Sequence, residues 1–332
     1  MELITEIAST HNGNVKDLYF LTKKHIQSNS DFIKYQIFKT ESLYSPKDKK
    51  FKEFKKLEIS FKNWRKLINK FKNKTRIILE PFDKESYEFT KKFKKSVNIK
   101  ISTSETDNLL IVQDAVRNFK KVFLNFSGYR YKEIKQILSK FDKKNKKKFV
   151  LMYGFQSYPS RARDMRFDLF NYFQKKGYDY GFADHSVFGF STDLLACFFI
   201  ALQKKCKFFE KHVCKKLAEK PDDYISSVEF SDMEKLIDLR NIFNSQIGEK
   251  IGEKNDEFTK AESEYAKSMH KNAFTNSIIK KGEKINLKNL IFLRSNIKGL
   301  KRLDFLNKSI YSSKKIPENS FIRLNDIINK KK

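Results

Sequence analysis

The sequence contains little cysteine, which limits the classes of protein to which it can belong. Its 332 residues include only Cys197, Cys206 and Cys214, an odd number without a CxxC pair. Secreted domains built on disulfides use many paired cysteines, whereas cytosolic proteins keep their thiols reduced. We therefore expect three reduced, buried or half-buried thiols in a cytoplasmic protein.

Long apolar runs are also lacking. The most apolar stretch, residues 194–202, is much shorter than the roughly 20 residues that a membrane-spanning helix needs. The first residues form a strand-like run that contains Glu2 and Glu6, without the basic and apolar regions of a signal peptide. We expect a soluble protein with no membrane partner.

Glycine is scarce, and acidic residues are outnumbered by basic ones. The chain has 10 Gly, 33 Phe and a formal net charge of +30. Abundant Lys, Asn and Ile are typical of an A+T-rich genome. The basic residues are scattered without a segregated tail, so we interpret them as solvated helix faces that also attract anionic substrates, with no specific nucleic-acid partner. A nucleic-acid-binding protein, the alternative, would have a contiguous basic face and salt-sensitive binding.

Strand-like runs alternate with amphipathic helical windows eight times along the chain. This alternation predicts an α/β fold, a (β/α)8 TIM barrel, with a doubly wound open sheet as the alternative. The expected strands are 3–8, 32–38, 76–79, 98–102, 121–126, 149–153, 180–183 and 207–211; the expected helices are 16–27, 61–72, 84–94, 109–118, 132–141, 164–175, 192–203 and 231–245.

The composition changes after the last of these helices. Residues 249–267 are charged and weakly periodic, which indicates a linker with extended arms. Several short strand-like runs follow, with a Lys-Lys-Gly-Glu turn at 280–283. We therefore expect a barrel domain over residues 1–248, the linker over 249–267 and a small β-rich domain over 268–332.

Two histidines lie where predicted strands end. His185 follows the run 180–183, His212 follows the run that begins at Phe208, and the helical stretch 192–203 separates them. The carboxyl ends of parallel strands face one side of the sheet, so the two imidazoles can converge. Neutral imidazole is a favoured ligand of Mn, Zn and Fe, which predicts a shared metal site. The alternative is two unrelated histidines that hydrogen-bond to the backbone.

Two lysines lie inside otherwise apolar predicted strands, Lys34 in 32–38 and Lys100 in 98–102. A buried lysine is costly unless it is paired, and strand alternation can point both into a polar barrel mouth that binds an anion. The alternative is a lysine that extends from a strand edge into solvent. Glu6 and Glu105 are candidate sugar-hydroxyl acceptors or general acid–base groups, and the alternative is a structural ion pair with these lysines.

Short polar motifs follow one another along nearly the whole chain. They are Glu6, His11-Asn12-Gly13, Lys34-x-Gln36, Pro81-Phe82-Asp83, Lys100-Ile101-x-x-x-Glu105, Tyr158-Pro159, Asp184-His185-Ser186, Glu210-Lys211-His212, Pro221-Asp222, and, in the tail, Lys280-Lys281-Gly282-Glu283 and Phe292-Leu293-Arg294. The order of these motifs resembles that of the sialic acid synthase family, which includes the legionaminic and pseudaminic acid synthases. The tail is similar to the C-terminal SAF, or antifreeze-like, domain of that family.

The resemblance implies a transferase that condenses phosphoenolpyruvate with an N-acylated amino-hexose, such as N-acetylmannosamine, to give a nine-carbon 2-keto sugar acid and phosphate. It implies a divalent cofactor, Mn²⁺ or Mg²⁺, and a homodimer in which the SAF domain covers the partner's barrel mouth. The implied metal ligands are His185 and His212; the catalytic residues are Glu6, Lys100 and Glu105; and the substrate-binding residues are Lys34, Gln36, Thr103, Ser127, Gln156, Tyr158, Asp222 and Arg294.

The chain departs from the family pattern where phosphate is expected to bind. Leu79-Glu80 stands in place of Ser-Thr, Phe126 and Ala183 replace serines, and Tyr153-Gly154 replaces His-Cys. A carboxylate at Glu80 would repel phosphate unless it is paired or turned away. These departures imply a divergent member whose acceptor need not be N-acetylmannosamine. A catalytically impaired sugar-binding paralogue is the alternative function.

Overall fold

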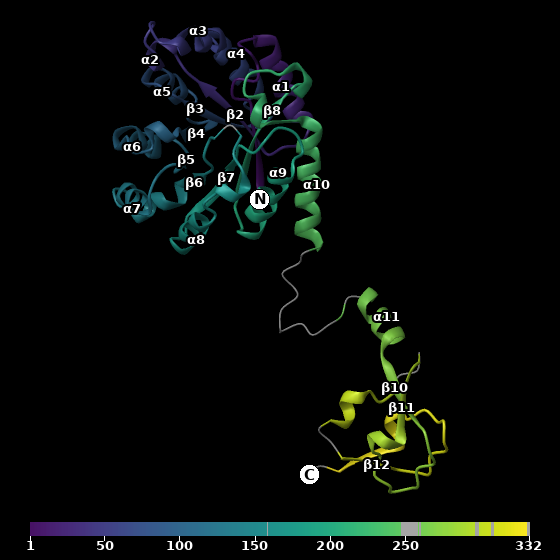
Figure 1. Cartoon of the computed structure of the whole chain (residues 1–332). Helices are drawn as coiled ribbons and strands as arrows, with labels where there is room; N and C mark the ends of the chain where they lie inside the picture. The colour runs from purple at the N-terminus through teal and green to yellow at the C-terminus, as the bar shows by residue number, and fades with distance from the viewer. Residues whose placement is uncertain (158, 247–257, 259, 296–298, 307–308, 331–332) are drawn as a thin grey trace. The chain divides into compact units, whose positions relative to one another are not determined.

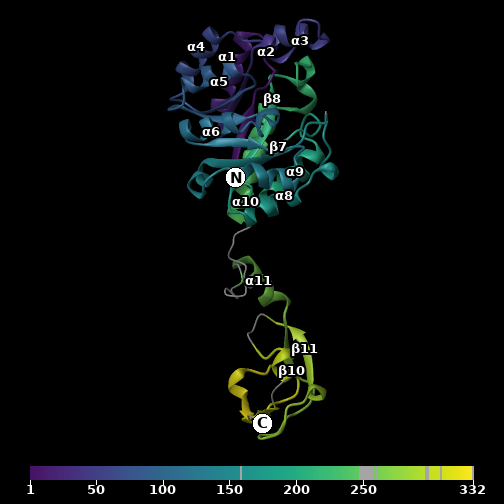
Figure 2. The ribbon, with the colours of Figure 1, turned by 90° about the vertical axis from the view of Figure 1, so that its left-hand side faces the viewer.

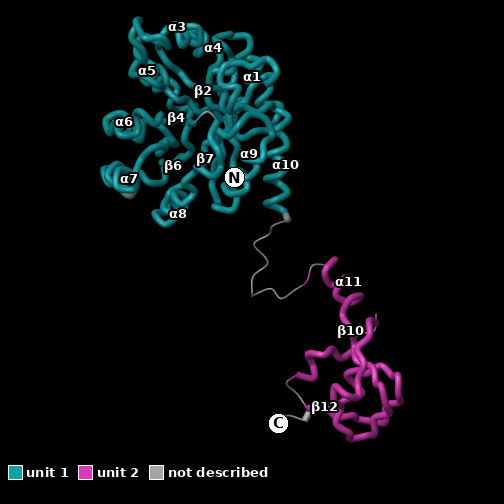
Figure 3. The backbone as a smooth tube through the Cα atoms, in the orientation of Figure 1, with its two compact units in different colours: residues 1–247 teal, residues 248–332 magenta. Residues whose placement is uncertain are grey.

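The computed structural model describes the chain except residues 158, 247–257, 259, 296–298, 307–308 and 331–332. It divides into two compact units, residues 1–247 and 248–332 (Figure 3). Each unit has its own buried apolar core. The two units are therefore described separately.

The first unit is a closed barrel of eight parallel strands, with helices outside the ring of strands (Figures 1 and 2). Each strand pairs with the next in sequence order, and β1 pairs in parallel with β8 to close the ring. The predicted TIM barrel is thus confirmed, and the open sheet is excluded. The strands are β1 (Glu2–Glu6), β2 (Phe32–Ile37), β3 (Arg76–Pro81), β4 (Val97–Ile101), β5 (Val122–Asn125), β6 (Phe149–Tyr153), β7 (Asp179–Asp184) and β8 (Phe208–Cys214), and a short β9 (Ser227–Glu229) pairs with β8.

The helices alternate with the strands as expected, with additions after β2. The short α2 and the longer α3 precede α4 there, and the sequence pattern did not indicate them. The helices are α1 (Val15–Gln27), α2 (Thr40–Leu43), α3 (Lys49–Leu57), α4 (Phe61–Phe71), α5 (Lys84–Lys91), α6 (Leu109–Asn118), α7 (Tyr131–Leu138), α8 (Asp168–Lys175), α9 (Thr192–Gln203) and α10 (Phe230–Gln246).

Side-chain caps define where several barrel helices begin. Asn14 caps α1, Ser60 caps α4, Asp83 caps α5, Asn108 caps α6 and Ser191 caps α9, each by accepting a hydrogen bond from a backbone N–H of the first turn. Such caps satisfy donors that have no partner within the helix. All of these caps except Ser60, which follows α3, lie in loops that follow strands, so they also fix these loops at the carboxyl end of the barrel.

The interior of the barrel has two layers of different character. Strand alternation points every second side chain inward. On several strands an apolar residue is therefore followed, two residues later, by a polar one: Ile4 precedes Glu6, Phe32 precedes Lys34, and Phe208 precedes Glu210. The apolar layer consists of Ile4, Phe32, Ile78, Phe123, Val150, Met152, Ala183 and Phe208. It forms the closed floor beneath the polar side chains at the carboxyl ends of the strands.

We expect this floor to contribute strongly to stability. The Ile78 side chain is fully buried, so Ile78→Ala should lower the free energy of unfolding by about 2–5 kcal/mol through lost burial and the remaining cavity. The matched control is Ile242→Ala on α10, because Ile242 is 50% exposed and its truncation should change stability by less than about 0.5 kcal/mol. Urea unfolding measures the free energy of unfolding of both variants. Equal losses of stability in the two variants would contradict the burial of Ile78 in the barrel floor.

The second unit is small and rich in strands. It contains α11 (Lys260–Met269) and two antiparallel pairs, β10 (Lys271–Thr275) with β11 (Leu290–Arg294), and β12 (Ser309–Ser312) with β13 (Ile327–Lys330). Its core is apolar and separate, and includes Ala273, Ile279, Leu290, Phe292, Ile310 and Ile322. The predicted linker thus contains a helix at its end; its residues 249–257 and 259 lie outside the described part of the chain.

Two expectations from composition can be compared with the structure. The three cysteines are free and buried, as predicted. Within the described residues, no helix combines the length and the apolar character that crossing a membrane requires.

Candidate functional site at the carboxyl ends of the barrel strands

A cavity of about 430 Å³ opens above the polar layer of the barrel. Its lining comes from five strands, β2 to β5 and β8, and from the loops after β3 to β7, so residues distant in sequence meet there. The lining residues are Lys34, Gln36, Glu80, Phe82, Lys100, Ser102, Thr103, Ser104, Asn125, Ser127, Gly128, Gly154, Phe155, Gln156, His185, Glu210 and His212. A polar, concave site at this end of a TIM barrel is typical of an active site.

Two lysines and three carboxylates form a buried cluster at the base of the cavity. Lys34 Nζ contacts Glu6 and donates hydrogen bonds to Glu80 Oε2 at 2.6 Å and Glu210 Oε1 at 2.9 Å. Lys100 Nζ donates to Glu210 Oε1 at 2.7 Å and lies 3.9 Å from Glu80 Oε1. Both lysines are 2% exposed, so the alternative of lysines extending into solvent is wrong. Glu6 is paired with Lys34, which is the structural ion pair that the sequence offered as the alternative to an acid–base role for Glu6.

The cluster changes the pKa values of its members in different directions. Burial lowers the pKa of Lys34, although Glu210 and Glu80 oppose this effect. Burial also disfavours the charge on Lys100, but Glu210 and Glu80 outweigh it and raise the pKa of Lys100. Burial disfavours the Glu210 carboxylate, yet Lys100 and Lys34 hold its pKa well below the usual range. Lys100 and Glu210 therefore stay charged at neutral pH.

The two histidines converge above this cluster, as the sequence predicted. His185 directly follows β7, and His212 lies within β8, two residues before its end. Their ring centroids are 5.0 Å apart. Burial lowers the pKa of His185 to about 3 and that of His212 well below its usual value. Both imidazoles are therefore neutral at pH 7 and carry the lone pairs that metal ligation needs.

The donor set around the histidines fits a divalent metal with two nitrogen ligands. His212 Nε2 is buried and has no hydrogen-bond partner among the described residues, while His185 Nε2 lies 3.1 Å from Gln156 Nε2. No group of three or more His, Cys, Asp or Glu side chains within the described residues is arranged to hold an ion. The histidine pair could therefore hold a metal only if water or substrate oxygens complete its coordination.

A second buried ion pair holds the strands that carry the histidines. Lys211 Nζ donates to Asp184 Oδ2 at 2.6 Å and to the carbonyl oxygen of Ser186 at 3.1 Å. Ser186 Oγ donates to the same carboxylate oxygen at 2.6 Å. Asp184 and Lys211 are register partners on β7 and β8. These contacts fix the backbone beside His185 and His212.

Four of the predicted substrate-binding residues line the cavity beside the charged cluster: Gln36, Thr103, Ser127 and Gln156. Ser127 Oγ donates to Asn125 Oδ1 at 2.7 Å and to the Gly154 carbonyl oxygen at 2.7 Å. These bonds link the loops after β5 and β6. The structure thus brings polar side chains from β2, β4, β5 and β6 into one wall of the cavity.

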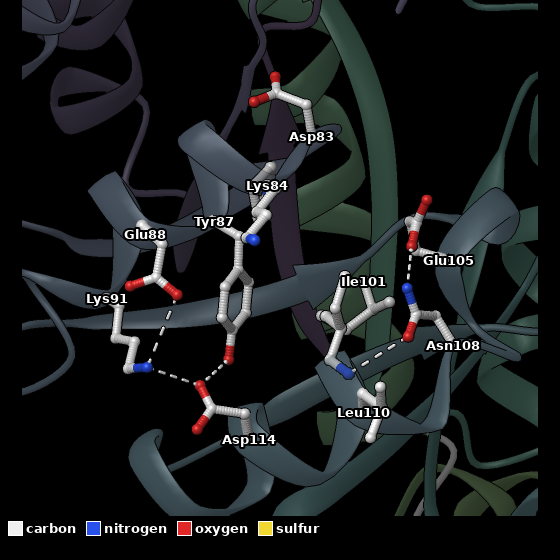
Figure 4. Close-up of a pocket in the computed structure, with 12 residues that line it drawn as sticks. Asp83, Lys84, Tyr87, Glu88, Lys91, Ile101, Glu105, Asn108, Leu110 and Asp114 are labelled. Carbon is white, nitrogen blue, oxygen red and sulfur yellow. Dashed lines mark hydrogen bonds and ion pairs between the residues drawn. The ribbon is translucent and has the colours of Figure 1, made fainter. Parts of the chain in front are cut away.

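Glu105 lies outside this cavity. It ends the 3-10 turn Thr103–Glu105 after β4, and its Oε2 accepts a hydrogen bond from Asn108 Nδ2 at 2.8 Å. It lines a separate pocket of about 460 Å³ on the outer side of the barrel, formed by α5 and α6 (Figure 4). Across this pocket, Asp114 accepts a hydrogen bond from the Tyr87 hydroxyl and forms an ion pair with Lys91. Glu105 is therefore not an ion-pair partner of Lys34 or Lys100.

The remaining predicted residues lie elsewhere. Asp222 is exposed in the loop after β8, where its backbone N–H donates to Asn12 Oδ1 at 2.8 Å. The neighbouring Asp223 Oδ2 accepts from the Ser9 N–H at 3.0 Å, so this loop is joined to the loop after β1. Arg294 is exposed at the end of β11 in the second unit. Tyr158 lies outside the described residues.

The sequence reading did not select Glu210 as a site residue, although it holds both lysines. Glu210 precedes His212 by two positions on β8, so strand alternation turns both side chains to the same face. This two-residue spacing from His212 is the feature of the sequence that indicates Glu210 as a site residue. Glu80 stands out in the sequence as a departure from the family pattern. Its contact with Lys34 follows only from the three-dimensional structure of the barrel.

Comparison with known proteins assigns the chain to a family. Residues 21–252 match the NeuB family, which is well over half of the chain. The chain therefore belongs to the NeuB family, and the resemblance inferred from its motifs is confirmed at that level. None of the curated proteins matches it.

Solved structures share the fold at low sequence identity. A Chromobacterium violaceum protein named as spore coat polysaccharide biosynthesis protein E has 19% identity and a TM-score of 0.75, over 98% of this chain and 99% of that one. N-acetylneuraminic acid synthetase from Leptospira borgpetersenii, in complex with citrate, has 22% identity and a TM-score of 0.65, over 80% and 91%. Spore coat polysaccharide biosynthesis protein SpsE of Bacillus subtilis has 18% identity and a TM-score of 0.61, over 99% and 96%. At these identities, the likeness concerns the fold.

Proposed function

We propose that this protein is a sialic acid synthase-like enzyme that condenses phosphoenolpyruvate with an N-acylated amino-hexose and releases phosphate. The observation that carries the proposal is the convergence of Lys34, Lys100, His185 and His212 on one cavity of the barrel. Membership of the NeuB family supports it. The reaction forms a carbon–carbon bond between C3 of the enolpyruvate and the aldehyde carbon of the open-chain sugar.

The lysines supply the positive charge that an anionic donor needs. The pKa of Lys100 is raised, so it is charged at neutral pH and can orient the carboxylate and phosphate of phosphoenolpyruvate. As C3 attacks, positive charge develops at C2, where water adds before phosphate leaves. The Glu210 carboxylate in the lining of the cavity, with Glu6 behind it, would stabilise that developing charge.

His185 and His212 would hold a divalent metal, Mn²⁺ or Mg²⁺. When bound, such an ion supplies Lewis-acid polarisation of the acceptor's aldehyde oxygen. The chain's own contribution is to keep both imidazoles neutral by burial and to hold their strands through the Asp184–Lys211 pair. Gln36, Thr103, Ser127 and Gln156 present hydrogen-bonding groups to the sugar hydroxyls.

The second unit is proposed to act as an SAF domain in a homodimer, with Arg294 binding the acyl group in the partner's barrel. Its separate apolar core supports an independently packed domain. The cytoplasm, where phosphoenolpyruvate is made, is the proposed location. Sedimentation of the full chain would test the assembly. The acceptor KM of an Arg294→Ala variant that still forms the same assembly would test the acyl contact.

The test of this function is phosphate release from phosphoenolpyruvate, with Mn²⁺ and a panel of N-acylated hexoses. We expect release that depends on both the metal and one acceptor, because the two substrates react only when held together. Metal removal by a chelator should stop it, and added Mn²⁺ should restore it. A folded, metal-loaded protein that releases no phosphate with any acceptor would contradict the proposal.

A second candidate function is favoured by one observation, the Glu80 carboxylate on Lys34. The five buried side chains carry three formal negative charges and two positive ones. A site with excess negative charge suits a neutral sugar better than a multiply charged anion. Acceptor binding without phosphoenolpyruvate turnover would identify such a sugar-binding paralogue.

A further inference from the structure

We propose that Glu80 is a specificity-determining residue that occupies, on Lys34, the place of an anionic substrate group, so that substrate binds by exchange with this carboxylate. The inference rests on the proposed function, since it concerns the same cavity. In this role, the Glu80 side chain determines how strongly the cavity binds ligands of different negative charge.

The first observation is that three carboxylates surround the Lys34 ammonium group. Glu6 is in direct contact with Nζ, and the Glu80 and Glu210 carboxylates accept hydrogen bonds from it at 2.6 and 2.9 Å. All of these groups are at least nine-tenths buried. A substrate anion that takes the place of a carboxylate on Lys34 must therefore displace one of these three.

The second observation identifies which carboxylate can leave. Glu6 is held by a further bond, because its Oε1 accepts from the Ala8 backbone N–H at 2.6 Å, and it does not line the cavity among the described residues. Glu210 Oε1 bridges Lys34 and Lys100. Glu80 lines the cavity near the end of β3 and makes one hydrogen bond, to Lys34; its other ion pair, with Lys100, is 3.9 Å long. Glu80 is the least anchored of the three.

The third observation is the charge balance. With Glu80 in place, the cluster holds three carboxylates and two ammonium groups. Without its charge, two carboxylates would balance two ammonium groups. Because the electrostatic energy grows with the charge of the ligand, the Glu80 carboxylate opposes phosphoenolpyruvate more strongly than a monoanion. The wild-type site thus binds a highly charged anion only at the cost of moving the Glu80 carboxylate away from Lys34.

The experiment is calorimetric binding of phosphoenolpyruvate and of pyruvate to the Mn²⁺-loaded full chain. Glu80→Gln removes the charge at nearly constant volume, and Glu80→Thr also removes the bulk. The matched control is Glu88→Gln on α5, whose glutamate is exposed and ion-paired with Lys91 on the same helix. Thermal unfolding verifies that each variant is folded.

We expect Glu80→Gln and Glu80→Thr to bind phosphoenolpyruvate at least about tenfold more tightly than wild type, with a smaller gain for pyruvate and no change for Glu88→Gln. Unchanged or weaker binding in either folded Glu80 variant would overturn the inference. An equal gain for both ligands would also overturn it, because that would assign the effect to space rather than charge. Acceptor-dependent phosphate release by the wild type, measured alongside, shows whether the proposed function holds even if this inference fails.

Discussion

His212→Ala is expected to abolish turnover and to weaken Mn²⁺ binding severely. The variant removes one of the two neutral imidazoles that meet above the charged cluster, and His212 Nε2 is a buried atom without a hydrogen-bond partner among the described residues. Loss of Lewis-acid stabilisation is worth several kcal/mol, which corresponds to a rate loss on the order of a thousandfold or more. Mn²⁺ binding, followed by electron paramagnetic resonance, tests the ligand role without relying on activity.

The control for this prediction is another buried histidine. His25 on α1 lies between Thr5 Oγ1 at 3.0 Å and Thr75 Oγ1 at 2.7 Å, outside the cavity. His25→Gln should alter stability but leave Mn²⁺ affinity unchanged. If His212→Ala bound Mn²⁺ as tightly as wild type, the two histidines would not be the metal ligands.

Lys100→Met is the second change with a large expected effect. It removes an ammonium group that is 2% exposed and leaves Glu210 and Glu80 with less compensation. Breaking a buried ion pair from one side costs about 3–5 kcal/mol of stability. We also expect loss of phosphoenolpyruvate binding, because the cavity loses a cation that stays charged at neutral pH.

A double variant separates the two effects of Lys100→Met. Adding Glu210→Gln removes the uncompensated carboxylate, so the double variant should recover part of the stability but none of the phosphoenolpyruvate binding. Lys121→Met is the surface control, since Lys121 is a half-exposed partner of Asp179 and should contribute less than about 1 kcal/mol. Recovery of binding in the double variant would contradict an anion-binding role for Lys100.

The strands and most helices of the barrel could be predicted because each has a clear apolar pattern. Residues 149–153 form β6 and residues 109–118 form α6, as the sequence indicated. The α3 helix was not predicted, because it is short and six of its nine residues are charged, although Phe51, Phe54 and Leu57 form an apolar stripe along it. The β9 strand has three residues and forms through its pairing with β8, which local sequence does not encode.

The site could be predicted where strand alternation alone sets the direction of a side chain. Lys34, Lys100 and His212 lie on strands, where adjacent side chains point to opposite faces. Their inward direction follows because residues next to them, such as Ile33, Ile99 and Val213, belong to the large apolar core of the first unit. Glu105 lies instead in a 3-10 turn, where its direction depends on a hydrogen bond from Asn108. The pairing of Glu80 with Lys34 depends on the register of β2 with β3, in which Gln36 lies opposite Glu80. Such cross-strand contacts require the three-dimensional structure.

The most direct test of the central claim is the transfer of carbon from phosphoenolpyruvate to the acceptor. Wild-type protein would be incubated with Mn²⁺, uniformly carbon-13-labelled phosphoenolpyruvate and the N-acylated hexose panel, and the products would be weighed by mass spectrometry. The account predicts a 2-keto sugar acid that carries the whole labelled pyruvyl unit, and none from His212→Ala. Labelled pyruvate and phosphate, with every hexose returned unlabelled, would contradict it.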